Sequence, residues 1–90
     1  MNGFTVNKNR RNNVDIMMAI LRIVLTERPR KTHIMYKANL NFAQLKKYLN
    51  YLTKKGLIEE VNFEGNKTYR LTAKGREMLK IYSQILEMLD

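Results

Sequence analysis

The stretch KTHIMYKANLNFAQLKKYLNYLTKKGLIE, from Lys31 to Glu59, decides the fold. Its apolar residues recur at helical spacing in two runs, which predict a short helix over about His33 to Ala38 and a longer one over Phe42 to Lys55. Between the runs lies Asn39-Leu40-Asn41, in which the first Asn tolerates the left-handed conformation that ends a helix and the last can cap the next helix. Two helices joined by such a tight turn form a helix-turn-helix motif.

The longer of these helices has two different faces. Its outer face is polar and basic, which is typical of a helix that reads DNA in this motif. Gly56 follows its last turn, where a glycine commonly ends a helix. The apolar face, which we expect to point toward the core, is made of Phe42, Leu45, Tyr48, Leu49 and Leu52.

Two short segments, Leu57 to Phe63 and Lys67 to Leu71, follow on either side of Glu64-Gly65-Asn66 and predict a β-hairpin. A two-residue turn at Gly65-Asn66 would place Asn62 opposite Tyr69. A three-residue loop would place Glu60 opposite Arg70 and Val61 opposite Tyr69. We favour the second register because it pairs charged with charged and apolar with apolar side chains. A hairpin after a helix-turn-helix is a wing.

A further helix is predicted on the N-terminal side, from Val14 to Thr26, with Asn12 or Asn13 as its cap. It is apolar nearly all round, whereas a surface helix is normally apolar over little more than about 100°. Such a helix needs cover on two sides, which indicates an oligomer.

The last predicted helix runs from Ala73 to Leu89 and begins at Thr72 as its cap. Several of its apolar residues step by four, three and four positions, which is the spacing of a coiled-coil seam. We therefore expect a homodimer joined through this helix. The residues expected at the dimer interface are Met78, Ile81, Tyr82, Ile85, Met88 and Leu89.

The charge is unevenly distributed along the chain. The sequence carries 17 Lys and Arg against 8 Asp and Glu, a formal net charge of +9. The excess lies in the first 72 residues, whereas residues 73–90 are neutral. A polyanion is the expected partner of the basic part, and a different partner is expected for the last helix.

Composition excludes several other classes of protein. Ninety residues form one domain, and the absence of Cys excludes disulfides, thiolate metal sites and thiol catalysis. His33 is the only His, so we expect no metal and no cofactor. The isolated glycines and the single Ser83 match no catalytic template, so we do not expect an enzyme.

No apolar run is long enough for a membrane span, and the polar, basic start is unlike a signal peptide, so we expect a cytoplasmic, nucleoid-associated protein.

The motifs of Lys31 to Glu59, together with Tyr69-Arg70-Leu71-Thr72-Ala73-Lys74-Gly75, resemble the archaeal winged helix-turn-helix family, which includes the ten-kilodalton DNA-binding proteins of Sulfolobus. The resemblance covers roughly half of the chain. It implies a winged-helix fold, DNA binding and a homodimer joined through antiparallel C-terminal helices. The N-terminal arm is longer and the last helix shorter than the family's pattern.

The expected DNA contacts lie on the second helix of the motif, around its turn and on the wing. Gln is able to bond both edge atoms of adenine, and Lys to reach guanine or phosphate. Thr32 either contacts phosphate or only caps the short helix with Lys31, and Arg70 either contacts DNA or pairs across the hairpin with Glu60. The full set is Lys31, Thr32, Lys37, Asn39, Asn41, Gln44, Lys46, Lys47, Tyr51, Lys54, Asn66, Lys67 and Arg70.

The expected architecture is mainly α with a small β-hairpin, a winged helix-turn-helix with a C-terminal dimerisation helix. Residues 1–13 form a flexible basic arm, 14–72 the winged helix-turn-helix domain and 73–90 the dimerisation helix. Lys8, Arg10 and Arg11 of the arm either enter a minor groove or add diffuse charge. The expected function is double-stranded DNA binding as a transcription regulator or nucleoid-type protein. The alternative is a protein-interaction module or RNA-binding subunit of a larger complex.

Overall fold

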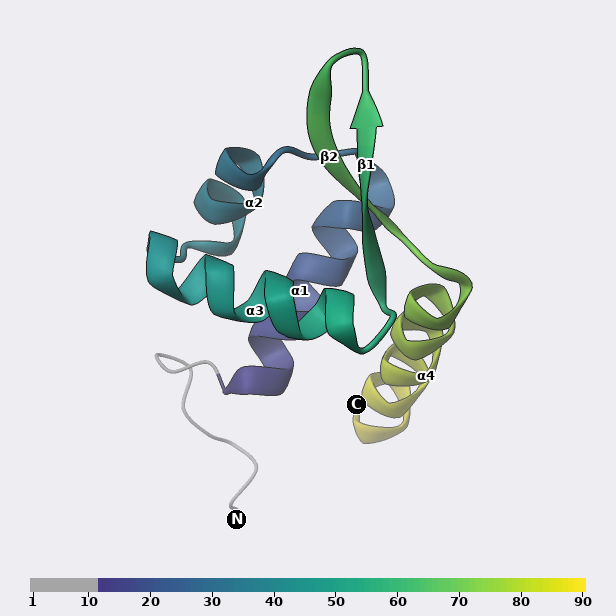
Figure 1. The fold of residues 1–90 in the computed structure, drawn as a ribbon. Helices are drawn as coiled ribbons and strands as arrows, with labels where there is room; N and C mark the ends of the chain where they lie inside the picture. Colours follow the sequence, from purple (N-terminus) through teal and green to yellow (C-terminus); the bar gives the residue numbers. More distant parts are fainter. Residues whose placement is uncertain (1–11) are drawn as a thin grey trace.

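The computed structural model describes residues 12–90. Residues 1–11 of the expected basic arm, with Lys8, Arg10 and Arg11, lie outside the described residues, whereas Asn12 and Asn13 belong to the start of the first helix. Within this described part, four helices and one hairpin follow one another (Figure 1). The mainly helical winged-helix fold expected from the sequence is confirmed. The elements are α1 (Asn13–Thr26), α2 (Lys31–Ala38), α3 (Phe42–Lys54), β1 (Ile58–Phe63), β2 (Asn66–Leu71) and α4 (Ala73–Leu89).

Side-chain caps set where three of the helices begin. Asn12 and Asp15 bond each other's backbone N–H groups in a capping box at the start of α1. Asn41 and Gln44 form a second capping box at the start of α3. The hydroxyl of Thr72 accepts from the N–H of Gly75 and caps α4. The predicted caps Asn12, Asn41 and Thr72 are thus confirmed.

The start of α2 differs from the prediction. The helix begins at Lys31, and its N-cap is Arg30, which makes no side-chain capping bond. Thr32 therefore lies inside the first turn, and its expected role as a cap is wrong. The other end is as predicted: Asn39 takes a left-handed φ of 57°, and the N–H of Leu40 donates to the carbonyl of Met35. Leu40 itself is buried in the corner between α2 and α3.

The core lies where α1, α2, α3 and the base of the hairpin meet. Its most completely buried large side chains are Ile20, Leu21, Ile34, Leu45, Leu52 and Ile58. The core needs no second chain around α1, whose residues Ile16, Met18 and Val24 are also buried within the protomer. The expectation that α1 requires a partner for cover is therefore wrong. Among its large apolar residues only Val14 and Leu25 are exposed.

The wing has neither of the two registers considered from the sequence. Its turn lies one residue earlier, at Glu64-Gly65, and Phe63 pairs with Asn66. Both turn residues have positive φ angles, 50° and 81°, which is the requirement of a tight turn whose twist matches the strands. Because glutamate rarely adopts such an angle, the sequence did not indicate it.

The register decides which wing residues face the same way. Glu59 pairs with Arg70 and Glu60 with Tyr69, so the predicted pairing of Glu60 with Arg70 is wrong. Successive strand residues point to opposite faces, which places these two pairs on opposite sides of the wing.

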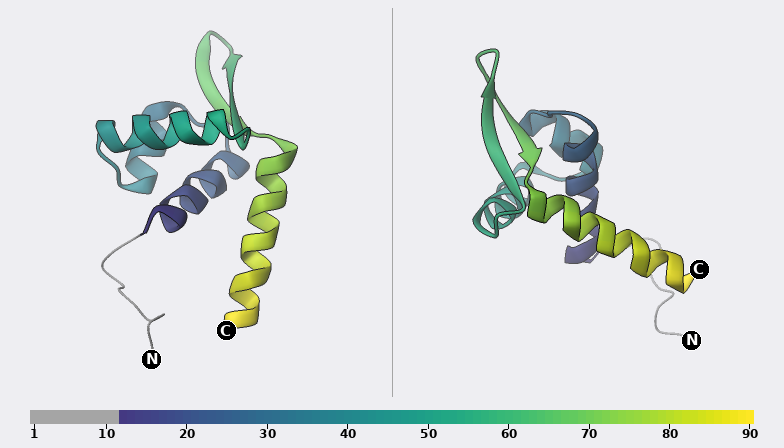
Figure 2. Two further views of the ribbon diagram at one scale, coloured as in Figure 1. Left: turned by 60° about the horizontal axis from the view of Figure 1, so that its bottom comes forward. Right: turned by 90° about the vertical axis from the view of Figure 1, so that its right-hand side faces the viewer.

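A dense junction joins α3, the wing and α4. Three consecutive carbonyls after α3 each accept a hydrogen bond from the start of α4: that of Lys55 from the amine of Lys74, that of Gly56 from the hydroxyl of Thr72, and that of Leu57 from the N–H of Thr72. From this junction α4 projects away from the wing (Figure 2). Within residues 12–90 no helix is long and apolar enough to cross a membrane.

Replacing Gly75 by Ala tests this junction. A Cβ atom at position 75 would overlap the carbonyl oxygen of Leu57, which already accepts from the N–H of Thr72. We expect G75A to lower the free energy of unfolding by about 1–3 kcal/mol, the typical cost of overpacking. Helix propensity alone would favour Ala by up to about 1 kcal/mol. Urea denaturation measures the difference.

The matched control is Ser83→Ala, which also raises helix propensity, by a smaller amount, at an exposed site of the same helix. We expect S83A to be neutral or slightly stabilising. A G75A variant as stable as S83A would show that the close contact does not hold the junction.

Candidate nucleic-acid interface

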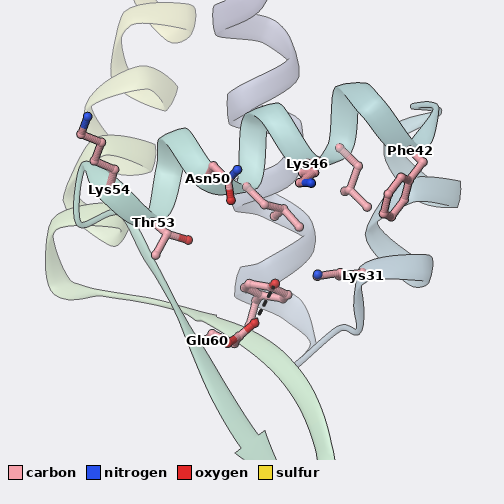
Figure 3. A pocket seen from close by; sticks show the side chains of 10 residues that line it. Lys31, Phe42, Lys46, Asn50, Thr53, Lys54 and Glu60 are labelled. Carbon is pink, nitrogen blue, oxygen red and sulfur yellow. Dashed lines mark hydrogen bonds between the residues drawn. The ribbon is translucent and has the colours of Figure 1, made fainter.

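A groove of about 590 Å³ runs between α3, the N-terminus of α2 and the wing. Figure 3 shows side chains of α3 lining one wall, with Lys31 of α2 and Glu60 of β1 on the other side. The groove brings together three of the predicted basic residues, Lys31, Lys46 and Lys54. It is lined in full by Lys31, Phe42, Leu45, Lys46, Leu49, Asn50, Thr53, Lys54, Glu60 and Tyr69.

The predicted residues of α3 fall on two flanks of the helix. At about 100° per residue, Lys46, Asn50 and Thr53 follow one another on the flank that borders the groove. By the same geometry Gln44 and Tyr51 lie on the opposite flank, with Lys47 on the outer face between them. The structure therefore does not bring Gln44 and Tyr51 into the groove.

Gln44 is also occupied by its role at the helix start. Its side-chain oxygen accepts from the N–H of Asn41 at 3.0 Å, while the Asn41 side-chain oxygen accepts from the N–H of Gln44 at 2.8 Å. Reading adenine through both edge atoms requires an amide whose oxygen and nitrogen are both available. Neither residue meets this requirement while the capping box is intact.

Phe42 is placed differently from the prediction. It was expected in the core, but its side chain is 63% exposed and lines the groove. Phe42 is the first residue of α3, and at about 100° per residue it falls on the same flank as Lys46 and Thr53, which borders the groove. Asn50, Thr53, Glu60 and Tyr69 also line the groove and lie outside the expected set of DNA contacts. The correct hairpin register would have indicated the last two.

Glu60 and Tyr69 form the wing side of the groove. The Tyr69 hydroxyl donates to the Glu60 carboxylate at 3.2 Å. Burial of the ring, together with the negative charge and hydrogen bond of Glu60, raises the pKa of Tyr69 to about 12. The groove thus holds one carboxylate in a fixed position among its lysines.

Arg70 lies on the other side of the wing. Its guanidinium contacts Glu59, with nitrogen-to-oxygen distances of 2.6 and 2.8 Å. This pair neutralises Arg70 and turns it away from the groove. At the tip, Asn66 donates to the carbonyl of Glu64 at 3.4 Å, and Lys67 is exposed beside it.

The end of α2 carries a small ionic cluster. Glu27 contacts His33 at 2.8 Å and Lys37 at 3.9 Å, so part of the positive charge expected for DNA is compensated here. The lone histidine is bonded locally. Among residues 12–90 there is no group of three or more side chains that would suit a metal ion.

On α4 the structure divides the expected interface residues. Tyr82 is half-buried against α1, where its hydroxyl donates to Asp15 at 3.2 Å and the Arg22 guanidinium lies 5.8 Å from the ring centre. Burial raises the pKa of Tyr82, and its bond to Asp15 adds to the effect. The exposed apolar residues of α4 are Met78, Ile81, Ile85, Leu86, Met88 and Leu89.

The Tyr69–Glu60 pair predicts a change of stability at high pH. Above its ordinary pKa of 10.0, Tyr69 ionises in the unfolded chain but keeps its proton in the folded one until about pH 12. Its contribution to stability is therefore complete below pH 10 and is lost as the pH rises toward 12. We expect Y69F to lose less stability than the wild type over this range in urea denaturation.

Glu60→Gln separates the two causes of this shift. E60Q removes the negative charge but leaves the ring buried, so the pKa of Tyr69 should fall below 12 and stay above 10.0. Ultraviolet absorbance of the tyrosinate follows it. A last-titrating tyrosine that E60Q leaves at pH 12 would contradict the assigned partner.

Comparison with known proteins agrees with this architecture. A family model described as winged helix-turn-helix matches residues 10–90. The uncharacterized protein MJ0287 of Methanocaldococcus jannaschii is 32% identical over 89 residues, which cover 93% of this chain and 84% of that protein. The crystal structure of Sso10a-2, a DNA-binding protein from Sulfolobus solfataricus, has a TM-score of 0.73 and 27% identity, and the match covers 87% of this chain and 81% of that one.

Two transcriptional regulators share the fold at lower identity. PcaV from Streptomyces coelicolor has a TM-score of 0.74 with 16% identity, covering 81% of this chain and 57% of its own. BldR from Sulfolobus solfataricus has a TM-score of 0.74 with 18% identity, covering 82% and 55%. The match thus spans little more than half of either regulator. The resemblance expected from the motifs is confirmed: this chain belongs to the winged helix-turn-helix family.

Proposed function

We propose that this protein binds double-stranded DNA, with α3 in the major groove and the wing along the sugar-phosphate backbone. The observation that carries the proposal is the groove, in which Lys31, Lys46 and Lys54 line a single concave surface made by α2, α3 and the wing. A helix-turn-helix reads DNA in this arrangement, because its second helix enters the major groove of the DNA and its first helix crosses the DNA backbone. The DNA-binding description of Sso10a-2, which is similar over most of both chains, supports it.

The contacts divide by their chemistry. Lys31 lies at the N-terminus of α2, where unpaired backbone N–H groups and a positive helix end favour a phosphate. Lys46 and Lys47 come from the middle of α3 and Lys67 from the wing, and all are exposed. Phosphate contacts of this kind position a protein on DNA without reading its sequence. We propose a binding role of this type, as a transcription regulator or a nucleoid-type protein, and not a catalytic one.

We further propose that the chain acts as a homodimer joined through α4. Met78, Ile81, Ile85 and Met88 step by three, four and three positions and are between 39% and 84% exposed. The spacing is that of a seam between two helices, and a single chain leaves it uncovered. This seam lies to one side of the one expected from the sequence, because Tyr82 faces α1. A second copy is the proposed occupant because the face repeats at the interval that a like helix requires.

Removing two lysines of α3 tests the DNA proposal. A protein that neutralises phosphates shows a logarithmic salt dependence of about 0.9 per contact. Lys46 and Lys54 both line the groove, so K46Q/K54Q should bind more weakly and lower the slope by about two. Fluorescence anisotropy measures binding to a mixed-sequence duplex of about three helical turns at several salt concentrations.

The control is R76Q/K80Q, which removes the same charge from exposed positions on α4. We expect its slope to match the wild type. Equal losses in both variants would show that only the total charge matters and that the groove is not the binding surface. Absence of binding by the wild type at low salt would favour the alternative of a protein or RNA partner.

Substitution on the seam tests the dimer. Ile85 and Met88 are 48% and 84% exposed and are not part of the hydrophobic core, so I85K/M88K should fold and sediment with the mass of one chain, 10.7 kDa. The wild type should sediment as a dimer. The control is Tyr36→Lys, at a side chain 80% exposed on α2, which should leave the dimer intact. A seam variant that still sediments as a dimer would disprove this interface.

A further inference from the structure

We propose that the groove prefers A·T base pairs, with Phe42 against a thymine methyl group and Asn50 on an adenine. This inference rests on the proposed binding of double-stranded DNA and adds a base preference to it. Phe42 is the large apolar side chain that the groove wall leaves exposed to solvent.

Phe42 is the first residue of α3 and is 63% exposed on the groove wall. The N-terminal residues of a reading helix are those that contact base edges. A phenyl ring gains nothing from a phosphate, which is charged and hydrated. The apolar group that DNA presents in the major groove is the methyl of thymine. Of the groups that DNA exposes in its major groove, the thymine methyl is therefore the best match for Phe42.

Asn50 lies two helical turns further on, and its side chain points into the same groove (Figure 3). Its amide makes no hydrogen bond to any other residue of the range 12–90. Both its oxygen and its nitrogen are therefore available, unlike those of Gln44, whose oxygen is held in the capping box. An asparagine amide with both groups available matches the N6 donor and N7 acceptor of adenine.

The separation of the two side chains predicts the separation of the two bases. Eight residues along a helix span about 12 Å, and base pairs are about 3.4 Å apart. With α3 along the groove, the two contacts fall about three to four base pairs apart. Lys46 lies between them on the same wall and is placed to hold the intervening backbone.

The experiment compares duplexes of equal length and salt that differ in single atoms. An alternating A·T duplex is compared with an alternating G·C duplex, with the A·T duplex carrying uracil for thymine, and with one carrying 7-deazaadenine for adenine. Loss of the thymine methyl should weaken wild-type binding about fourfold, the equivalent of one buried CH₂ group. Loss of adenine N7 should weaken it about fivefold or more, the lower end of a bidentate contact.

Variants assign each effect to its residue. F42A should bind the thymine and uracil duplexes equally, and N50A should bind the adenine and 7-deazaadenine duplexes equally. Both side chains are exposed, so both variants should fold. The controls are F63A, at an exposed ring of the wing, and N62A, at an exposed amide of β1, and each should keep the wild-type ratios.

The outcomes separate this inference from the function on which it rests. Salt-dependent binding that is equal for all four duplexes would overturn the base preference and leave DNA binding standing. An A·T preference that survives uracil and 7-deazaadenine would place the readout in the minor groove and would also overturn it. Absence of salt-dependent binding to every duplex would overturn the proposed function itself.

Discussion

The arrangement of the molecule depends on three carbonyl oxygens in the segment that directly follows α3. Those of Lys55, Gly56 and Leu57 all accept hydrogen bonds from the residues that open α4. The same bonds therefore hold the start of α4 and the base of the wing at the end of α3. Gly75 permits this because a larger residue would meet the Leu57 carbonyl. α3 and the wing, which both border the groove, meet at this junction.

Local chemistry made most of the fold predictable from the sequence. Asn12, Asn41 and Thr72 are residues whose side chains cap helices in almost any context, and the left-handed Asn39 ends α2 for an equally local reason. The predictions are wrong where a residue adopts a backbone conformation that its type disfavours, or where the burial of a helix depends on distant parts of the chain. Glu64 with a positive φ changed the register of the wing, and the cover of α1 came from its own chain.

The candidate site was predictable in its elements and less so in its residues. The sequence predicts the basic character of α3, but the pattern of polar residues on this helix does not determine which of its flanks borders the wing. The amide of Gln44 suits adenine, yet the same chemistry makes it a good capping partner for Asn41. Phe42 was assigned to the core by its spacing, although the first residue of a helix often lies beyond the core. The flank of α3, the bond of Gln44 and the exposure of Phe42 all depend on which residues lie nearby in the folded chain.

α4 packs against the protomer along its first half only, so the length of its second half defines a distance. Leu79 and Tyr82 hold its first half against the protomer, whereas residues beyond Ser83 project into solvent. In the proposed dimer the length of this projecting part sets how far apart the two grooves stand. One added heptad would lengthen it by about 10 Å, close to three base pairs of duplex. Relatives that share the same reading surface would then differ in the spacing of the sites they span through the length of their last helix alone.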